Sequence, residues 1–398
     1  MIPTSRLGRA GRMLGSAFAP TAAATTLGRL KGGAHKLGQT LALVADSMPP
    51  ELRGRLGALF GEAEPRPWHE VASAVDGISG LASVEEQPFA AASMGQVHRG
   101  IWGDGTAVAV KILYPGVADA LRADLDNLGT AALPARLVSG GTEMLAGLRN
   151  ALLAELDLRV EAGHATAMAE ALAPWPRLHV ARPIFATENV LIAEFLAGPT
   201  LHRVLRPVGG GPVDAELLAD DIVAAVMGPV FRAGIVNADA HPGNLLVQEG
   251  GLGLVDFGAV APVNDVAVLA RALDRALAGE TEGVLSELGV NAGALDADLR
   301  IALAPLGGGR WDFGNDTLME QLGELKRRKP FALRHLPFAN ERLPLIRAVM
   351  GLHHALRRLG VPFALGESLA RVRAVAAARV AHSHVLDLVA VDVEVGAR

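Results

Sequence analysis

The chain has 398 residues, of which 50% are apolar and 20% are charged, so it is long enough and apolar enough for two packed lobes and an extension. Its 37 basic and 42 acidic residues give a formal net charge of −5, which provides no support for a nucleic-acid partner. The absence of cysteine excludes disulfides, thiolate metal sites and cysteine nucleophiles, and it fits a reducing compartment.

Residues 1–30 are rich in Gly, Ala, Thr and Arg, and they predict a flexible N-terminal arm. Arg6, Arg9 and Arg12 precede an uncharged run that imitates a signal peptide but lacks a Leu- or Ile-rich centre. No uncharged apolar run reaches the roughly 18 residues that span a bilayer. We therefore expect a cytoplasmic protein, with contact at the periphery of a membrane through those arginines as a further expectation.

Residues 31–82 predict an N-terminal helical extension that carries the motif Lys-x-Gly-Gln. Apolar residues recur there at helical spacing until Pro49-Pro50 ends the pattern. Lys36 and Gln39 are three residues apart and share a helical face. Taken alone, that pair is no more than the polar edge of an apolar helix.

Residues 83–198 predict a β-rich lobe with an inserted helix. From Val84 to Leu113 the apolar period changes to two, and Gly103-Asp104-Gly105 marks a hairpin within three antiparallel strands. Helical spacing covers 117–172, and strands return between Leu178 and Leu196. Residues 199–398 then predict a mainly helical lobe.

The second lobe contains an ordered set of acidic and amide side chains. Asp239 is followed five residues later by Asn244, and Asp256-Phe257-Gly258 comes after a short hairpin pattern. Transfer of a phosphoryl group from a metal–nucleotide needs one carboxylate beside the attacking group, and an amide and a second carboxylate on Mg²⁺. We therefore predict Asp239 as a catalytic residue and Asn244 and Asp256 as the metal ligands.

Lys111 lies in an alternating apolar segment that predicts a strand, on one face with Ala109 and Leu113. A lysine among apolar residues needs an anion, and the phosphates of a nucleotide and a helix carboxylate would both serve. The alternative is an edge-strand lysine that points to water. The downstream acidic set favours the phosphate-binding role.

The carboxylate partner of Lys111 is expected on the next helix, where Glu155, Asp157 and Glu161 are the candidates. Asp157 and Glu161 are four residues apart and should share a helical face. Like charges on one face repel unless cations approach them, so Lys111, a metal ion or another lysine is expected nearby. The alternative is a solvated acidic face.

The segment PFAAASMGQV occupies the position of a loop that covers the nucleotide phosphates. Kinases place glycines there because backbone amides must approach the phosphates closely. This chain has Ala90, Ala91, Ala92 and Ser93 instead, and alanine restricts the backbone. The segment is therefore either a degraded loop or a loop built for a different nucleotide pose, and ordinary strand-turn alanines are the third alternative.

Two further motifs are weaker. His241 lies between Asp239 and Asn244, where a hydrogen bond to the backbone is favoured over a role as a metal ligand. A second Asp-Phe-Gly at Asp312 lacks an upstream Asp-x-x-x-x-Asn, so it is expected to have no catalytic role.

Six stretches together resemble the UbiB family of atypical kinase-like proteins, also called aarF-domain proteins. Their residues run from about 31 to 260 and read HKLGQ, PFAAASMGQV, VAVKILYPGV, ELDLRVEA, NADAHPGNLLV and LVDFGAV. The resemblance implies an α+β, two-lobe protein-kinase-like fold, with a β-rich N-lobe, an α-helical C-lobe and the helical extension covering the active site. It also implies ATP or ADP and Mg²⁺ as cofactors.

The resemblance assigns roles to the matching residues. Lys111 should pair with Glu161, and Lys36, with Gln39 beside it, should meet Glu155 and Asp157. Ala90–Ser93 would form the family's alanine-rich loop. The backbone around Glu194, Phe195 and Leu196 would hold the adenine.

Three departures from the family pattern stand near the predicted site. Asn237 replaces the usual His, Ala240 replaces a common Pro, and His164 stands where Asn is frequent. The first two leave the carboxylates intact but put the geometry of the loop in question.

The leading functional expectation is an ATPase or phosphotransferase that acts on a small or lipid-like molecule in quinone or lipid metabolism. Its expected partners are a nucleotide and a lipid or quinone-precursor ligand. A catalytically weak, nucleotide-dependent regulatory switch is the alternative, and a true protein kinase is a third.

Overall fold

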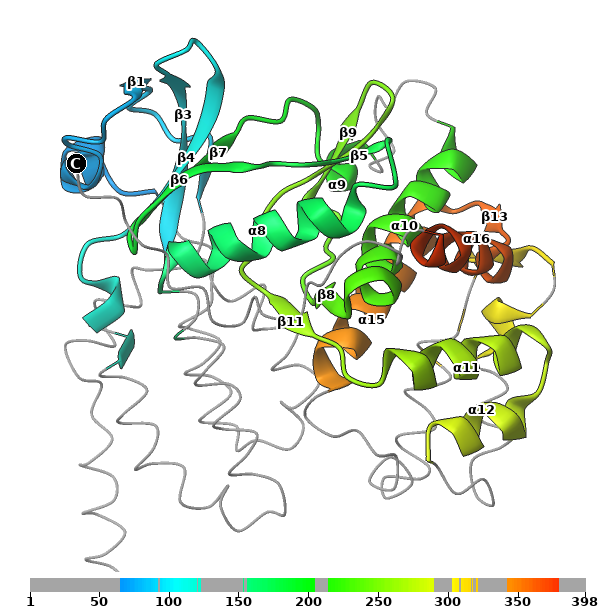
Figure 1. Cartoon of the computed structure of the whole chain (residues 1–398). Helices are drawn as coiled ribbons and strands as arrows, with labels where there is room; N and C mark the ends of the chain where they lie inside the picture. Colours follow the sequence, from blue (N-terminus) through cyan, green and yellow to red (C-terminus); the bar gives the residue numbers. More distant parts are fainter. Residues whose placement is uncertain are drawn as a thin grey trace, which may run out of the picture. The chain divides into compact units, whose positions relative to one another are not determined.

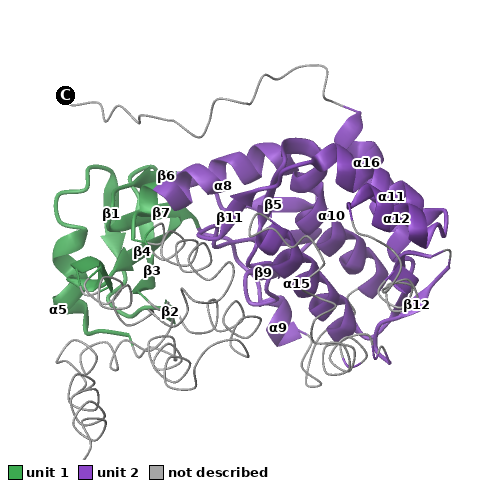
Figure 2. Cartoon of the chain, turned by 90° about the horizontal axis from the view of Figure 1, so that it is seen from below, with its two compact units in different colours: residues 1–159, 184–194 green, residues 160–183, 195–398 purple. Residues whose placement is uncertain are grey.

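The computed structural model describes residues 65–91, 94–119, 121–122, 153, 156–204, 214–289, 303–307, 309–315, 317, 320 and 342–378. The predicted arm and most of the predicted extension lie outside the described residues, together with Lys36, Gln39, Ala92, Ser93 and Glu155. The chain divides into two compact units, one made of Met1–Arg159 and Ile184–Glu194 and the other of Val160–Pro183 and Phe195–Arg398 (Figure 2).

The first unit is built on a six-stranded sheet in the order β1-β3-β4-β7-β6, with the short β2 paired to β3 (Figure 1). Its strands are β1 (Leu81–Val84), β2 (Ala90–Ala91), β3 (Gly95–Trp102), β4 (Ala107–Leu113), β6 (Pro183–Ala186) and β7 (Val190–Glu194). The strands between 81 and 113 pair antiparallel, as predicted. Gly105 turns the predicted hairpin with a φ of 88°.

Alternation along β4 gives this sheet two different faces. Val108, Val110 and Ile112 are fully buried on one face. Ala109 and Lys111 are half-buried on the other. By this alternation Lys111 shares its face with Ala109 and Leu113, as predicted, and Val108, Val110 and Ile112 are on the opposite side.

The buried face also carries two polar side chains, Gln96 and His98, with no exposed surface. The backbone N–H and C=O of Arg66 fix the orientation of the Gln96 amide, at 2.8 and 3.2 Å. The Gln96 Nε2 then donates to His98 Nε2 at 2.9 Å, so His98 Nδ1 carries the ring proton and donates to the carbonyl of Glu85 at 2.8 Å. Burial lowers the pKa of His98 below its ordinary value, which agrees with this neutral tautomer.

We expect His98→Phe to destabilise the protein by about 1–3 kcal/mol, because the phenyl ring leaves the Gln96 amide and the Glu85 carbonyl without their partner. Denaturant unfolding at pH 7.5 measures the effect. His179→Phe, at an exposed position of β5 (Leu178–Val180), is the matched control and should shift stability by less than about 0.5 kcal/mol. Equal effects of the two substitutions would contradict the role of the His98 hydrogen bonds.

A short helical segment precedes the sheet. Trp68–Val71 form α5 and Ala72–Ala74 continue as a 3₁₀ turn. Gly77 and Gly80 follow with φ values of 75° and 96°, a backbone conformation that favours glycine and ends the helical segment.

The second unit is mainly helical. Its helices are most of α8 (Leu158–Leu172), α9 (Leu201–Val204), α10 (Ala215–Ala233), α11 (Val266–Leu277), α12 (Thr281–Glu287), α15 (Leu343–Leu359) and α16 (Leu365–Ala377), with a 3₁₀ turn at Ala304–Leu306. Its strands are β5, β8 (Ile235–Asn237), β9 (Leu245–Gln248), β10 (Gly251–Leu254), β11 (Val260–Pro262), β12 (Trp311–Asp312) and β13 (Pro362–Phe363).

Helix α10 forms the centre of this unit, with α15 and α16 packed against it (Figure 1). It begins at Asp214, whose carboxylate accepts hydrogen bonds from the N–H groups of Glu216 and Leu217. It ends at Gly234, which adopts the left-handed conformation with a φ of 63°. Eleven of its residues are buried, which explains why its apolar positions extend around most of the helix.

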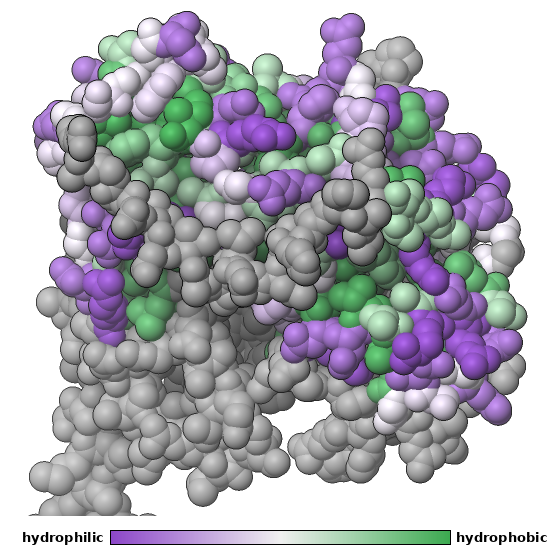
Figure 3. All heavy atoms as spheres, viewed as in Figure 1, coloured by the Kyte–Doolittle hydropathy of each residue, from purple (hydrophilic) through white to green (hydrophobic). Residues whose placement is uncertain are grey.

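Helices α11 and α12 form the polar side of the second unit, and hydrophilic side chains gather over them in the space-filling view (Figure 3). Arg271 pairs with Glu287 at 2.8 Å and Arg275 with Glu280 at 2.6 Å. Among the described helices, none combines the length and the apolar character that crossing a bilayer demands.

Candidate functional site

Strand pairing brings two short loops of the second unit together. β8 pairs with β11, and β9 pairs with β10, all antiparallel. Residues 238–244 connect β8 to β9, and residues 255–259 connect β10 to β11. Because the two loops begin and end on the same strand pairs, they must lie side by side. Two backbone hydrogen bonds confirm this, from Ala238 N to Ala259 O at 2.9 Å and from Val255 N to Asn244 O at 3.1 Å.

The first loop holds Asp239 and Asn244 in direct contact. Asp239 is only 4% exposed, and its Oδ2 accepts a hydrogen bond of 2.7 Å from Asn244 Nδ2. The same Nδ2 reaches the Asp239 carbonyl at 3.2 Å. This orientation commits the amide nitrogen to Asp239 and leaves the amide oxygen as the group of Asn244 that can serve as a metal ligand.

Asn237 connects the two loops, which the sequence did not reveal. Its Nδ2 donates to the carbonyl of Asp256 at 3.0 Å, and its Oδ1 accepts from the N–H of Asp239 at 3.0 Å. One amide thus fixes the backbone of both predicted acidic residues. Asn237 was noted only as a departure from the family pattern, and the structure gives it a positioning role.

We expect Asn237→Asp to reduce any nucleotide turnover by about 10–100-fold, because the carboxylate cannot donate to the Asp256 carbonyl. Asn237→His, which introduces the residue usual in the family, should retain more activity because imidazole has a donor. Steady-state kinetics of both variants, with the Km for ATP measured separately, tests the prediction. Equal losses in the two variants would contradict it.

The second loop has an unusual backbone at Asp256, which adopts a φ of 65°. This left-handed conformation is uncommon outside glycine, although aspartate tolerates it better than most residues. The Asp256 Oδ1 accepts from Gly258 N at 3.4 Å, and Phe257 is buried in the core. The hydrogen bond from Asn237 and the burial of the Phe257 side chain together keep Asp256 in this strained backbone conformation.

Helix α8 places two side chains, Glu161 and His164, beside the second loop. Glu161 is 7% exposed, and a Cβ built on Gly258 would lie 3.8 Å from its Oε2 and 3.6 Å from Asp256 Oδ1. The two carboxylates therefore flank one glycine. His164 Nδ1 donates to the carbonyl of Phe257 at 3.0 Å, and burial lowers the pKa of His164 more than this hydrogen bond raises it.

The remaining phosphate-binding candidates lie in the first unit. Lys111 stands opposite Val97 on β3 and Leu191 on β7, and Val97 stands opposite Ala90 on β2. Directly opposed residues of antiparallel strands present their side chains on the same face. Ala90 and Lys111 thus belong to one row across three strands, and Ala90 and Ala91 form the exposed strand β2.

The predicted adenine segment lies where the chain passes from one unit to the other, between Glu194 and Phe195. Glu194 is the last residue of β7 and pairs with Val108. The side chain of Leu196 approaches β10, since a Cβ on Gly253 would be 3.1 Å from its Cδ1.

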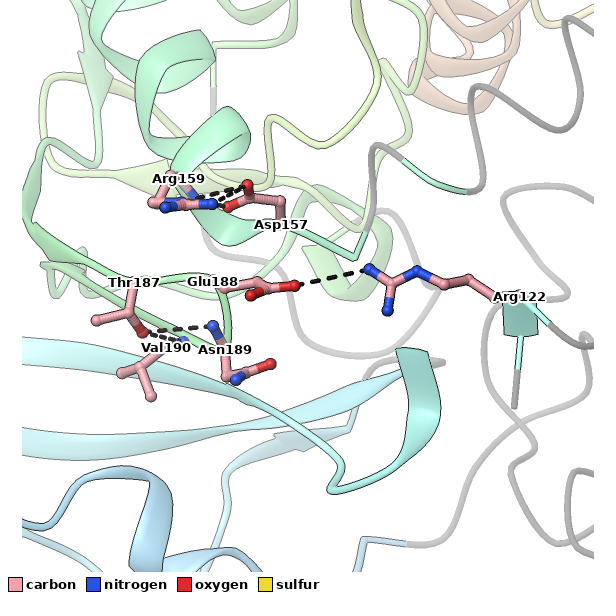
Figure 4. Close-up of polar contacts among 7 residues, drawn as sticks. All are labelled: Arg122, Asp157, Arg159, Thr187, Glu188, Asn189 and Val190. Atoms are coloured by element: carbon pink, nitrogen blue, oxygen red, sulfur yellow. Dashed lines mark hydrogen bonds and ion pairs between the residues drawn. The ribbon is translucent and has the colours of Figure 1, made fainter. Parts of the chain in front are cut away.

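The structure gives Asp157 a different environment from the one predicted. It precedes α8 instead of sharing a helical face with Glu161, so that prediction is wrong. Its Oδ1 accepts from the N–H of Arg159 at 3.0 Å, as in a helix cap, and the Arg159 guanidinium forms an ion pair with it at 2.7 Å (Figure 4). These hydrogen bonds lower the pKa of Asp157. Close by, Glu188 forms an ion pair with Arg122 at 3.7 Å (Figure 4).

The structure shows the surroundings of the two weaker motifs. His241 Nδ1 accepts a backbone hydrogen bond from Gly243 at 3.0 Å. The carboxylate of Asp312 accepts hydrogen bonds from the N–H groups of Gly314 and Asn315 at the end of β12, while Phe313 is buried. The second Asp-Phe-Gly is therefore a local turn with an apolar anchor.

The side chains on the two loops suit a magnesium ion bound together with phosphates. Asp239, Asn244 and Asp256 offer hard oxygen atoms, the type of ligand that Mg²⁺ prefers. Mg²⁺ usually takes one or two carboxylates from a protein and completes its coordination with phosphates and water.

Comparison with known proteins gives a consistent family. The ABC1 atypical kinase-like domain matches residues 76–286, which is more than half of the chain. "Atypical kinase COQ8B, mitochondrial" from Rattus norvegicus is 35% identical over 192 residues, covering 45% of this chain and 36% of that protein. "Atypical kinase coq-8, mitochondrial" from Caenorhabditis elegans is 28% identical over 252 residues, covering 59% and 33%.

"Probable serine/threonine-protein kinase abkA" from Dictyostelium discoideum is 27% identical over 263 residues, covering 59% of this chain and 46% of that protein. The matched regions thus span between a third and a half of these curated relatives.

A solved structure shows the fold. The complex of Rv3197 with erythromycin from Mycobacterium tuberculosis has a TM-score of 0.64 and 26% identity, and the match covers 92% of this chain and 98% of that one. The α+β, protein-kinase-like fold predicted from the motifs is confirmed by this match and by the antiparallel sheet and helical unit described above. The chain belongs to the ABC1 atypical kinase-like family, to which the UbiB-type motifs of its sequence had pointed.

Proposed function

We propose that this protein binds Mg-ATP, or ADP, and turns ATP over as an ATPase or a phosphotransferase. The proposal depends on the two neighbouring loops that follow β8 and β10. Hydrogen bonds connect these loops and hold the buried Asp239, its partner Asn244 and the strained Asp256 together. Phosphoryl transfer depends on positioning and on stabilising charge, and pre-ordered loops of this kind supply both.

Each side chain has a chemical task in this proposal. Asp239 orients the attacking hydroxyl or water and accepts its proton. Asn244 and Asp256 hold the Mg²⁺, which would neutralise charge on the phosphates. Lys111 contacts the α- and β-phosphates and pairs with Glu161, whose burial favours a cationic partner.

The other proposed contacts surround this centre. The loop Ala90–Ser93 covers the phosphates, and the backbone at Glu194, Phe195 and Leu196 receives the adenine. Lys36 and Gln39 of the N-terminal extension act with Glu155 and Asp157. In that case Arg159 must share Asp157 with Lys36 or release it.

The proposed role lies in quinone or lipid metabolism, as the resemblance of the motifs to the UbiB family implies, with a lipid or quinone-precursor ligand and contact at the periphery of a membrane. Phosphate release measured with and without lipid vesicles and phenolic acceptors tests the proposal. Turnover that requires Mg²⁺ supports it, and stimulation by vesicles supports the lipid connection. Nucleotide binding without turnover under every condition would reject it.

A nucleotide-dependent switch is the second candidate, and one observation favours it. Ala90 and Ala91 lie in an extended strand paired with β3, so this part of the phosphate-covering segment lacks the freedom of a glycine loop. This candidate predicts that nucleotide binding matters to the cell and that turnover does not.

A further inference from the structure

The chain that directly follows the predicted adenine segment is attached to the outer edge of β9. β9 is the last strand in the sheet order β5-β10-β9, so one of its edges faces away from β10. Along that edge, the N–H of Val247 donates to the carbonyl of Pro199 at 2.9 Å, and Thr200 forms an antiparallel bridge with Leu246. These backbone contacts anchor the chain immediately beyond Leu196 and its neighbours.

Gly198 allows the chain to come this close to the strand. It has a φ of 141°, and a Cβ built on it would lie 2.4 Å from the carbonyl oxygen of Val247. Both features favour glycine over other residues. Glycine accepts a wide range of φ values, however, so the peptide group between Ala197 and Gly198 rotates more easily than an ordinary one. Another contact is needed to fix the orientation of that peptide group.

The side chain of Gln248, the last residue of β9, provides this contact. Its Nε2 donates a hydrogen bond of 3.0 Å to the carbonyl of Ala197. A Cβ built on Gly253 of β10 would lie 3.2 Å from Gln248 Cδ and 3.1 Å from Leu196 Cδ1. The side chains of Gln248 and Leu196 therefore both lie against Gly253, where the missing side chain gives them room.

The same stretch of chain is also connected to the predicted catalytic loop. It continues into α9, where the backbone N–H of His202 donates to the carbonyl of Pro242 at 3.1 Å. Pro242 lies between Asp239 and Asn244, and β9 begins directly after Asn244. Residues 196–202 are thus held against the strand and the loop that position the predicted metal ligand Asn244.

We propose that Gln248 is a positioning residue that fixes the peptide groups of the adenine segment and thereby contributes to the selection of adenine over guanine. Adenine has an N6 donor where guanine has an O6 acceptor, so peptide groups held in one orientation suit only one of these bases. The inference rests on the proposed function for the location of the adenine. The attachment of residues 196–202 to β9 is independent of that function.

Displacement calorimetry on the full chain tests the inference with Mg-ADP and Mg-GDP. The ratio of the Kd for GDP to the Kd for ADP measures base selectivity, and a variant that folds incompletely changes both constants by the same factor. Gln248→Leu should lower this ratio about 2–5-fold by raising the Kd for ADP. That is the lower part of the range for one hydrogen bond, because this bond is exposed to water.

Two further variants sharpen the test. Glu249→Leu introduces the same side chain at the next position, which is exposed in the turn, and should keep the wild-type ratio. Gly253→Ala leaves the Gln248 donor in place but crowds the side chains of Gln248 and Leu196. It should therefore also lower the ratio.

The outcomes separate the inference from the proposed function. An unchanged ratio in Gln248→Leu, or an equal decrease in Glu249→Leu, would overturn the inference and leave ATP turnover unaffected as a proposal. A wild-type protein that binds ADP and GDP equally would do the same. A ratio that depends on Gln248 in a protein without ATP turnover would support the inference and reject the proposed function. Binding of neither nucleotide by the wild type would overturn both.

Discussion

Asp239→Asn should lower the rate constant for ATP turnover by about 10²–10⁴-fold, the usual contribution of a positioned general base. The amide keeps the size of the carboxylate and still offers an oxygen to Asn244 Nδ2, so the loop should retain its conformation. It cannot accept a proton from the attacking group. The affinity for nucleotide, measured by calorimetry, should therefore change by no more than a few-fold.

The exposed Asp76→Asn provides the charge-matched control and should show wild-type turnover. Complementation of a deletion strain separates the two candidate functions. If Asp239→Asn complements as well as the wild type while Lys111→Ala fails, the protein acts as a nucleotide switch and the catalytic proposal is wrong. If both fail, turnover is needed in the cell.

Gly251→Ala should destabilise the protein by about 3 kcal/mol or more, the largest effect on stability expected from a single methyl group at the glycines that the structure describes. Gly251 begins β10, a strand buried throughout. A Cβ there would overlap the backbone carbonyl of Arg177, which accepts a hydrogen bond from Leu252 N at 2.8 Å. Rigid backbone cannot move aside as a side chain would, so the pairing of β10 with β5 must be distorted.

Gly163→Ala is the matched control. Gly163 lies exposed within α8, with no atom within 4 Å of the added methyl group, so the substitution should stabilise the helix by about 0.5–1 kcal/mol. Thermal and denaturant unfolding of both variants measures the contrast. A decrease of less than about 1 kcal/mol in the free energy of unfolding of Gly251→Ala would contradict the prediction, because it would show that β10 can shift to make room for the methyl group.

Local patterns sufficed to predict much of the fold. The period of two in β3 and β4 and the hairpin at Gly105 depend on residues close together in the chain. The order of Asp239, Asn244 and Asp256 indicated a kinase-like fold for the same reason, because the loops after β8 and β10 are separated only by the short β9–β10 hairpin. The match to the family and to a solved structure confirms that fold.

Contacts between distant residues were not predictable in this way. Gln96 binds the backbone of Arg66, which lies 30 residues away, and Asn237 binds the carbonyl of Asp256, which lies 19 residues away. A polar residue within an apolar strand gives no sign of which backbone group it will meet. Asp157 was misjudged for a different reason, since its partner is its near neighbour Arg159 and the helix begins only after it.

The strand pairs β8–β11 and β9–β10 hold the two acidic loops side by side. They also determine where the chain tolerates an insertion in this region. An inserted residue between Asp239 and Asn244 would lengthen the loop that carries both side chains and disturb the hydrogen bond of 2.7 Å between Asn244 Nδ2 and Asp239 Oδ2. The exposed Glu249-Gly250 turn joins β9 and β10 at their far end, and Gly250 already has a φ of 94°. A peptide tag or a fluorescent reporter is therefore best accommodated between these two residues, where it lengthens the hairpin tip and leaves the spacing of the acidic groups unchanged.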